Sequence, residues 1–111
     1  MSALYVFIGS GIGGVLRWLI SSHLNTSHPW GTMLVNILGC LLIGLLSRHV
    51  PADSQAKLLL VAGFCGGFTT FSTFINENLL MLQGTQLAAS LLYIAASLVL
   101  GLLAAWLGYN I

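Results

Sequence analysis

The sequence predicts an all-α membrane protein with four transmembrane helices. Of its 111 residues, 58% are hydrophobic and 5% are charged, whereas soluble domains carry roughly 25% charged residues. The few charges leave long uncharged runs, at 1–16, 18–47, 58–76 and 78–111. A membrane-spanning helix needs about 20 mostly apolar residues, so four of them use about 80 residues. We therefore expect a single transmembrane domain over residues 1–111, with no room for a separate soluble domain.

Breaker and cap residues separate the four spans. Pro29 precedes the second span, and Pro51 and Asp53 mark the polar loop before the third. The short loop QGTQ separates the third span from the fourth. We expect the spans at about 3–22, 31–48, 57–82 and 86–109. An even number of spans places both termini on the same side of the membrane.

The basic residues fix the orientation of the chain only weakly. Arg48 and Lys57 flank the loop between the second and third spans, and Arg17 lies near the opposite surface. Lys and Arg collect in cytoplasmic loops, and a bias of two to one leaves two interpretations open. Either Arg48 and Lys57 suffice to fix one orientation, or the chain inserts both ways and two opposed copies form an antiparallel dimer.

Neither an enzyme nor a nucleic-acid-binding protein is expected. The net charge of +1 provides no basic surface for nucleic acid. Glu77 is the only acidic residue inside a span, so paired carboxylates are not available within one chain. The run GSGIGG at 9–14 matches a dinucleotide-binding pattern, but residues 28–36 lack the acidic residue that such a site requires. We interpret these glycines as a helix-packing surface.

The segment 63–78, GFCGGFTTFSTFINEN, predicts an irregular third helix. Gly66 and Gly67 permit backbone dihedral angles that a helix does not use, and the hydroxyl groups that follow can bond freed backbone groups. Irregular backbone inside a membrane is tolerated only where it is buried in protein or lines a polar cavity. We therefore expect the third helix to be broken at the membrane midplane, where broken helices hold ions.

Two rows of side chains follow the predicted break. Phe71 and Phe74 form an aromatic row, and Thr73 and Glu77 belong to a row that can form hydrogen bonds. The positive edge of an aromatic ring can contact an anion without offering a fixed charge. On the second span, the amide of Asn36 must find partners, because an unsatisfied polar group in hydrocarbon is costly. It either binds a permeant ion or joins two helices.

Arg17, near the end of the first span, has three interpretations. Its side chain extends to the membrane surface, pairs with Glu77, or attracts anions to a vestibule. Extension to the surface is the ordinary behaviour of an arginine at a helix end.

Three motifs follow one another along the first three spans: GxGGxxRW at 11–18, GTMLVN at 31–36 and GFCGGFTTFSTF at 63–74. In a chain of this length and span count, they closely resemble the Fluc (CrcB) family of fluoride channels. The resemblance implies a passive, fluoride-selective channel of the inner (plasma) membrane that exports toxic fluoride. The absence of Lys and Arg deep in the spans agrees with this, because conduction requires binding weak enough for the ion to leave.

The resemblance also implies an assembly. Its expected form is an antiparallel, dual-topology dimer of two copies, or of this chain with a close paralogue, with two pores in the bilayer. In such channels a structural Na⁺ at the dimer interface is held by backbone carbonyls, which correspond here to Gly66 and Thr69. Arg17 is expected to have a vestibule or structural role. The implied pore residues are Asn36, Phe71, Ser72, Thr73, Phe74 and Glu77, with Tyr93 and Ser97 on the fourth span.

Two other classes of protein have a similar size. Small proton-coupled multidrug or cation exporters also have four helices, but they carry their essential carboxylate in the first helix, and residues 1–22 contain no Asp or Glu. A purely structural membrane subunit is the third possibility, and it leaves the polar cluster at 69–73 without a purpose.

Overall fold

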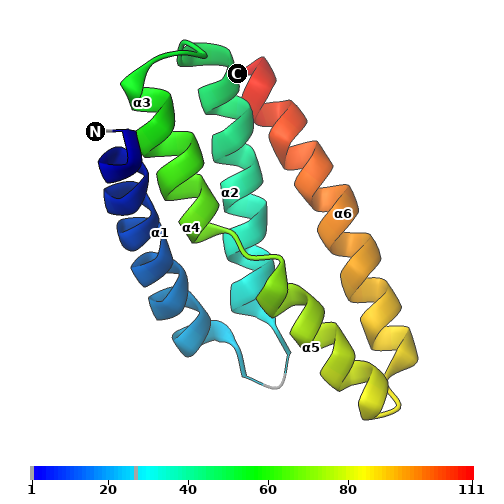
Figure 1. Cartoon of the computed structure of the whole chain (residues 1–111). Coiled ribbons are helices and arrows are strands. Elements are labelled where there is room, and N and C mark those ends of the chain that lie inside the picture. Colours follow the sequence, from blue (N-terminus) through cyan, green and yellow to red (C-terminus); the bar gives the residue numbers. More distant parts are fainter. Residues whose placement is uncertain (1, 27) are drawn as a thin grey trace.

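The computed structural model describes residues 2–26 and 28–111, and every regular element among them is a helix (Figure 1). The elements are α1 (Ser2–Leu24), α2 (Trp30–His49), α3 (Gln55–Lys57), η1 (Leu58–Cys65), α4 (Gly66–Phe68), α5 (Ser72–Gln83) and α6 (Leu87–Asn110). The helical segments Ser2–Leu24, Trp30–His49, Gln55–Gln83 and Leu87–Asn110 are long and apolar enough to cross a membrane. The predicted all-α fold with four spanning segments is therefore confirmed.

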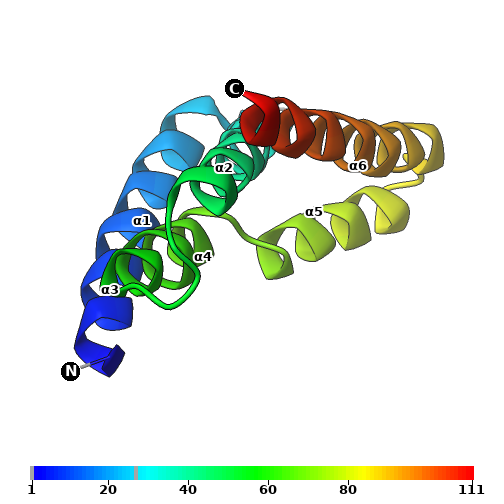
Figure 2. The same cartoon turned by 90° about the horizontal axis from the view of Figure 1, so that it is seen from above.

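The helices form two arms that meet at α2. Helix α1 packs along η1 and α4, and α6 packs along α2. Figure 2 shows that α5 runs beside α6 and away from α4, so the arms diverge below α2. The first described residues of α1 and the end of α6 lie at the same end of the bundle (Figure 1).

Helix α1 approaches the third segment backbone to backbone. A Cβ atom added at Gly13 would meet the carbonyl oxygen of Phe64, and one added at Gly67 would meet the backbone of Ser10. The hydroxyl of Ser10 donates a hydrogen bond to the carbonyl of Gly63 at 3.3 Å. Small residues allow this approach in lipid, where no hydrophobic force drives helices together. Gly13, within the 9–14 run, is a packing residue, as interpreted from the sequence.

The irregular region differs from the prediction in one respect. Gly66 has the α-helical angles φ −61° and ψ −38°, and both glycines belong to α4. The prediction that this pair departs from helical angles is therefore wrong. Gly67 instead allows a close contact, because a Cβ atom there would meet the backbone of Ser10. The non-helical residues are 69–71, between α4 and α5, and Thr69 is extended at φ −88° and ψ 157°. We call residues 69–71 the linker.

Helices α2 and α6 form the other close contact. A Cβ atom at Gly44 would meet the carbonyl oxygen of Ala105, and one at Gly108 would meet that of Leu41. At the open end of the pair, the guanidinium of Arg48 donates to the carbonyl of Tyr109 at 3.1 Å. These contacts make α2 and α6 one unit, and they set the position of the α6 side chains relative to α2.

Candidate functional site

Asn36 of α2 binds the linker through both atoms of its amide group. Its Oδ1 accepts a hydrogen bond from the Thr70 N–H at 2.8 Å, and its Nδ2 donates to the Thr70 carbonyl at 3.2 Å. The linker lacks helical hydrogen bonds at this point, and unpaired backbone groups are costly away from water. Asn36 therefore joins two segments, which is one of the two roles that the sequence left open.

Two threonine hydroxyls complete the ends of the adjoining helices. Thr69 Oγ1 donates to the carbonyl of Cys65 at 2.8 Å, at the end of α4. Thr70 Oγ1 accepts from the N–H of Thr73 at 3.2 Å, at the start of α5. Hydroxyl side chains commonly cap freed backbone groups in this way. The linker is thus a defined structure, held from α2 and capped at both ends.

Arg17 lies at the end of α4. Its Nε donates to the carbonyl of Gly67 at 3.1 Å. A cation is favourable at the C-terminal end of a helix, where carbonyl groups remain free. Arg17 forms no salt bridge with Glu77 among the described residues, since the Glu77 carboxylate has other partners. This hydrogen bond connects α1 to the end of α4.

The Glu77 carboxylate is the centre of a polar cluster. Its Oε2 accepts from Thr32 Oγ1 at 2.7 Å and from Asn25 Nδ2 at 3.3 Å. Its Oε1 accepts from the hydroxyl of Tyr93 at 2.7 Å. Asn25 also accepts from the N–H groups of Gly31 and Thr32 through its Oδ1, at 2.7 and 3.1 Å. The cluster joins α5, α6, the start of α2 and the loop before it.

Asn25 and Thr32 were not among the predicted site residues. Asn25 lies in a loop, where helical periodicity gives no information about direction. Its role depends on the loop folding back over the start of α2, where Asn and Asp side chains commonly cap the free N–H groups. That preference is the one signal in the sequence that could have identified it.

The aromatic residues divide into an inner and an outer one. The ring of Phe74 meets that of Tyr93 edge to face, with 4.9 Å between centroids, and it is 8% exposed. Phe71 lies 6.2 Å from Phe74 between centroids and is 73% exposed. One chain therefore encloses Phe74 and presents Phe71 outward.

The remaining predicted residues do not join this cluster. Ser72 is exposed and Thr73 is half-buried on α5. The hydroxyl of Ser97 on α6 is buried and has no hydrogen-bond partner among the described residues. A separate buried link ties α5 to α6, because Ser90 Oγ donates to Asn78 Oδ1 at 2.7 Å.

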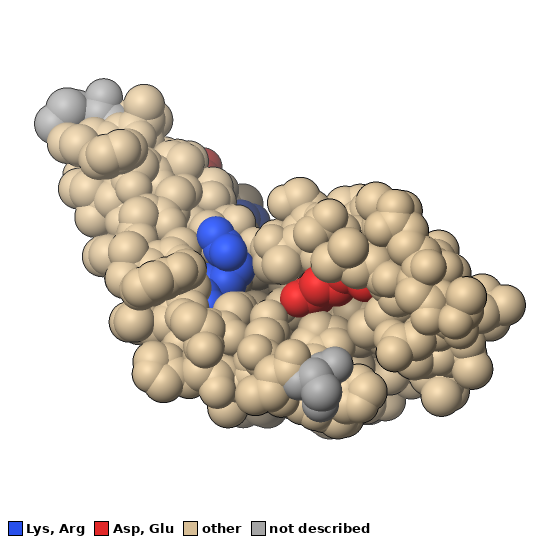
Figure 3. Space-filling view, turned by 90° about the horizontal axis from the view of Figure 1, so that it is seen from below, with Lys and Arg blue, Asp and Glu red and all other residues tan. Residues whose placement is uncertain are grey.

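Charged side chains border a hollow between the arms. Figure 3, seen from below, shows basic and acidic atoms on opposite sides of it. A polar pocket of about 260 Å³ opens beside Glu77 and is also lined by Asn25, Thr26 and Gln86. The described residues contain no group of three His, Cys, Asp or Glu side chains that could hold a metal ion. Besides the carboxylate of Glu77, the groups that can contact ions here are hydroxyls, amides, ring edges and backbone carbonyls.

Known proteins resemble the chain over nearly its whole length. The model of the family described as "CrcB-like protein, Camphor Resistance (CrcB)" matches residues 4–109. The fluoride-specific ion channel FluC of Flavobacterium psychrophilum is 44% identical over 112 residues, which cover 94% of this chain and 90% of the relative. That of Serratia proteamaculans is 50% identical over 93% of this chain and 90% of the relative. That of Thermus thermophilus is 43% identical over 97% and 92%.

Proposed function

The chain belongs to the CrcB-like family, and from this membership we propose that it is a passive, fluoride-selective ion channel. It is a multi-pass integral protein of the plasma membrane, and it exports fluoride and so protects the cell from its toxicity. The observation that carries the proposal is the near full-length similarity to relatives named as fluoride-specific ion channels. Transport of an anion, and not catalysis, is therefore the proposed activity.

The chemistry of the site suits a small anion that must be released again. Phe74 and Tyr93 bring two aromatic rings together beside the cluster around Glu77, and a ring edge carries partial positive charge. Arg17, the basic residue nearest the linker, is engaged with the Gly67 carbonyl. Conduction requires binding that is weak enough for exit, which uncharged donors and ring edges provide. The proposed path follows Asn36, Phe71, Ser72, Thr73, Phe74, Glu77, Tyr93 and Ser97.

The proposed position of the linker is the membrane midplane. The linker divides the segment Gln55–Gln83 into a helical part at 55–68 and another at 72–83. The two parts are of similar length, so a segment that crosses the membrane has its linker near the centre. The third spanning helix is then a broken helix, and Asn36 supplies the hydrogen bonds that the break removes.

The working unit of the proposal is an antiparallel dimer with two pores, formed by two copies or by this chain and a close paralogue. Phe71, at 73% exposed, and the exposed Ser72 have no cover within one chain. Phe71 is the last residue of the linker and Ser72 is the first residue of α5, so a second chain that covers this junction would bury both. Each path would then combine residues of both chains.

A structural Na⁺ at the centre of that dimer is the proposed cofactor. Broken transmembrane helices coordinate Na⁺ through unwound carbonyls and the C-terminal ends of half-helices. Gly66 and Thr69 fit this chemistry, because Gly66 belongs to the short helix α4 and Thr69 directly follows its C-terminal end, where the helix dipole favours a cation. Their carbonyls would hold the ion, while Arg17 remains on the carbonyl of Gly67 between them.

Fluoride efflux from proteoliposomes tests the proposed function. Liposomes loaded with fluoride or with chloride should release only fluoride when the protein is present and a K⁺ ionophore balances the charge. Phe74→Ile should slow this release, and Ile75→Phe, at an exposed neighbouring position on α5, should leave it unchanged. Proton-coupled exchange of an organic cation, with no fluoride release, would contradict the channel and favour the small-exporter alternative.

The assembly has separate tests. Single-cysteine variants near the two ends of α6 should crosslink end to opposite end in native membranes, and crosslinking of like ends alone would contradict the antiparallel dimer. Replacing Na⁺ by N-methylglucamine should reduce the dimer fraction in detergent. An unchanged dimer fraction would contradict the Na⁺ site, and the proposal of a fluoride channel would still stand.

A further inference from the structure

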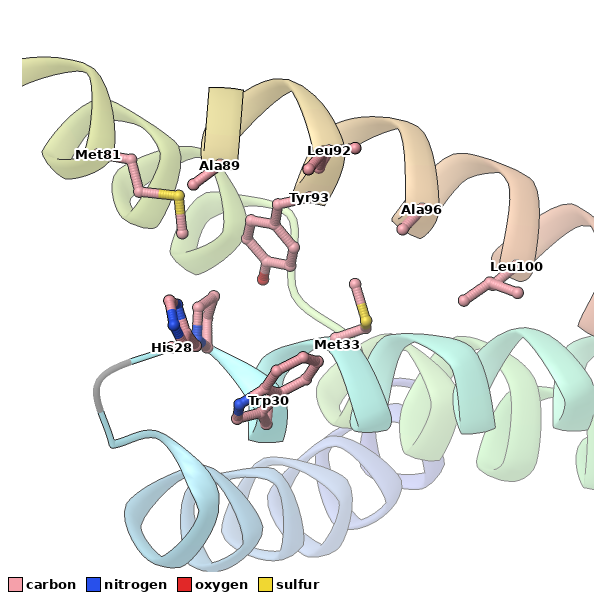
Figure 4. A pocket seen from close by; sticks show the side chains of 10 residues that line it. His28, Trp30, Met33, Met81, Ala89, Leu92, Tyr93, Ala96 and Leu100 are labelled. Atoms are coloured by element: carbon pink, nitrogen blue, oxygen red, sulfur yellow. The ribbon is translucent and has the colours of Figure 1, made fainter. Parts of the chain in front are cut away.

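A second pocket, apolar and of about 450 Å³, opens between α2, α5 and α6 (Figure 4). Its volume falls within the range of small-molecule sites. Along α6 it extends from Ala89 to Leu100, which is about 16 Å at 1.5 Å per residue. One leaflet of a hydrocarbon core about 30 Å thick has a similar depth. The pocket therefore has the length of an acyl chain that reaches from the membrane surface toward the midplane.

The two ends of this pocket differ in polarity. At one end, His28, Pro29 and Met81 also line the polar pocket beside Glu77. Trp30 lies there too, with its ring 6.0 Å from that of His28 and 59% of its surface exposed, and tryptophan is enriched at the membrane surface. The other end, at Leu100, is apolar. A site with a polar end at the surface and an apolar body in the membrane is complementary to a lipid.

We propose that this pocket binds one acyl chain of a phospholipid, with the headgroup at His28. Met33 and Met81 line the pocket from opposite sides (Figure 4), and flexible methionines adapt to a mobile chain. Ala96 leaves space on α6 for the methylene groups. The lipid lies against the ring of Tyr93, whose hydroxyl bonds Glu77. Any effect of the bound acyl chain on transport rests on the proposed function, because the acyl chain would then support Tyr93, a residue of the proposed ion path.

The occupant is a lipid and not the second copy. The residues that one chain leaves uncovered beside the linker, Phe71 and Ser72, do not line this pocket, and neither does Arg17. The pocket thus shares only its His28 end with the polar pocket beside Glu77, and its body along Ala96 and Leu100 includes none of these uncovered residues. On a protein with four spanning segments, a face without a protein partner contacts lipid.

Fluorescence of Trp30 tests the proposal without measuring transport. A variant with Trp18→Phe and Trp106→Phe keeps Trp30 as its only tryptophan. The delipidated protein in detergent is titrated with phosphatidylcholine that carries bromine on its acyl chains, and quenching of Trp30 should saturate. Ala96→Phe fills the pocket and should weaken the apparent affinity by about tenfold or more, because fewer methylene groups are buried.

Two further variants separate a specific effect from a general one. Ala95→Phe adds the same ring at an exposed neighbouring position of α6 and should leave the titration unchanged. Met33→Phe narrows the pocket from α2 and should reproduce the loss seen with Ala96→Phe. Quenching that does not saturate, or that is equal in all variants, overturns the proposal. Absence of quenching shows that protein covers Trp30, and it overturns the proposal as well, whether or not the protein conducts fluoride.

Discussion

Asn36 and Thr70 are joined by a pair of hydrogen bonds that uses both ends of one amide. The Thr70 N–H lies 2.8 Å from Asn36 Oδ1, and the Thr70 carbonyl lies 3.2 Å from Asn36 Nδ2. An amide carries a donor and an acceptor on two neighbouring atoms without charge, so it can pair with both the N–H and the carbonyl of one residue. The geometry of the linker thus depends on the chemistry of a single side chain.

Asn36→Asp should therefore destabilise the protein and abolish fluoride efflux. The carboxylate has no donor for the Thr70 carbonyl, and it places an acceptor against another acceptor. Leaving a buried polar group unsatisfied costs about 1–3 kcal/mol. Thermal unfolding in detergent and efflux from proteoliposomes measure the two effects. Asn110→Asp, the same change at an exposed position, serves as the control, and equal behaviour of the two variants would contradict the prediction.

Gly13→Ala should lower the free energy of unfolding by about 1–3 kcal/mol, as overpacking generally does. The new methyl group would meet the Phe64 carbonyl and would lie 2.8 Å from the Phe68 nitrogen, so α1 has to move. Gly11→Ala is the matched control, because a Cβ atom at Gly11 meets nothing within 4 Å. Chemical denaturation followed by circular dichroism compares the two. If Gly11→Ala were as unstable as Gly13→Ala, the loss would come from replacing any glycine of α1 and not from the clash with the Phe64 carbonyl.

Tyr93→Phe isolates the hydrogen bond to Glu77 from the ring contact with Phe74. The hydroxyl donates to Glu77 Oε1 at 2.7 Å, and removing a bond to a charged group costs about 1.5–3 kcal/mol. We expect a lower unfolding temperature and slower fluoride efflux. Tyr109→Phe, at the exposed end of α6, should change neither. Efflux at the normal rate from Tyr93→Phe would show that the ion path does not depend on this bond.

Phe71→Ala and Phe74→Ala should impair the protein in different ways, the first by weakening the dimer and the second by lowering the stability of the fold. Phe74 is 8% exposed within one chain, so its truncation leaves a cavity and costs about 3 kcal/mol or more of stability. Phe71 is 73% exposed, and under the proposed assembly its truncation lowers the dimer fraction instead. Unfolding temperature and single-molecule subunit counting distinguish the two effects. Loss of stability in both variants with no change in dimer fraction would contradict the outward role of Phe71.

The sequence predicted the fold well because charge is so informative in a membrane protein. The positions of five charged residues, together with the breaker residues in the loops, predicted four spanning helices. The need of Asn36 for partners also followed from its position inside a predicted span. Its partner did not, because the pairing with Thr70 depends on where α2 passes the linker, a property of the packed helices.

The position of the linker was harder to predict. Gly66 and Gly67 suggested irregular backbone, yet both are helical, and the chain departs from the helix at Thr69. Conformational freedom and close packing both favour glycine, so a glycine pair does not reveal which of them applies. Gly67 serves packing against Ser10. The threonines that follow were the better indication of the departure.

Helix α5 is attached to α6 by side-chain hydrogen bonds. The principal partner of α5 is α6, and side-chain hydrogen bonds from Glu77 and Asn78 tie it to Tyr93 and Ser90. Glu77 and Tyr93, which are proposed to line the ion path, thus also attach α5 to α6. A substitution that alters selectivity will therefore also weaken the attachment of α5 to α6. The residues tolerated at these positions are restricted by the stability of that contact as well as by the ion. Paired substitutions, one on α5 and one on α6, can change the ion path while keeping the two helices attached.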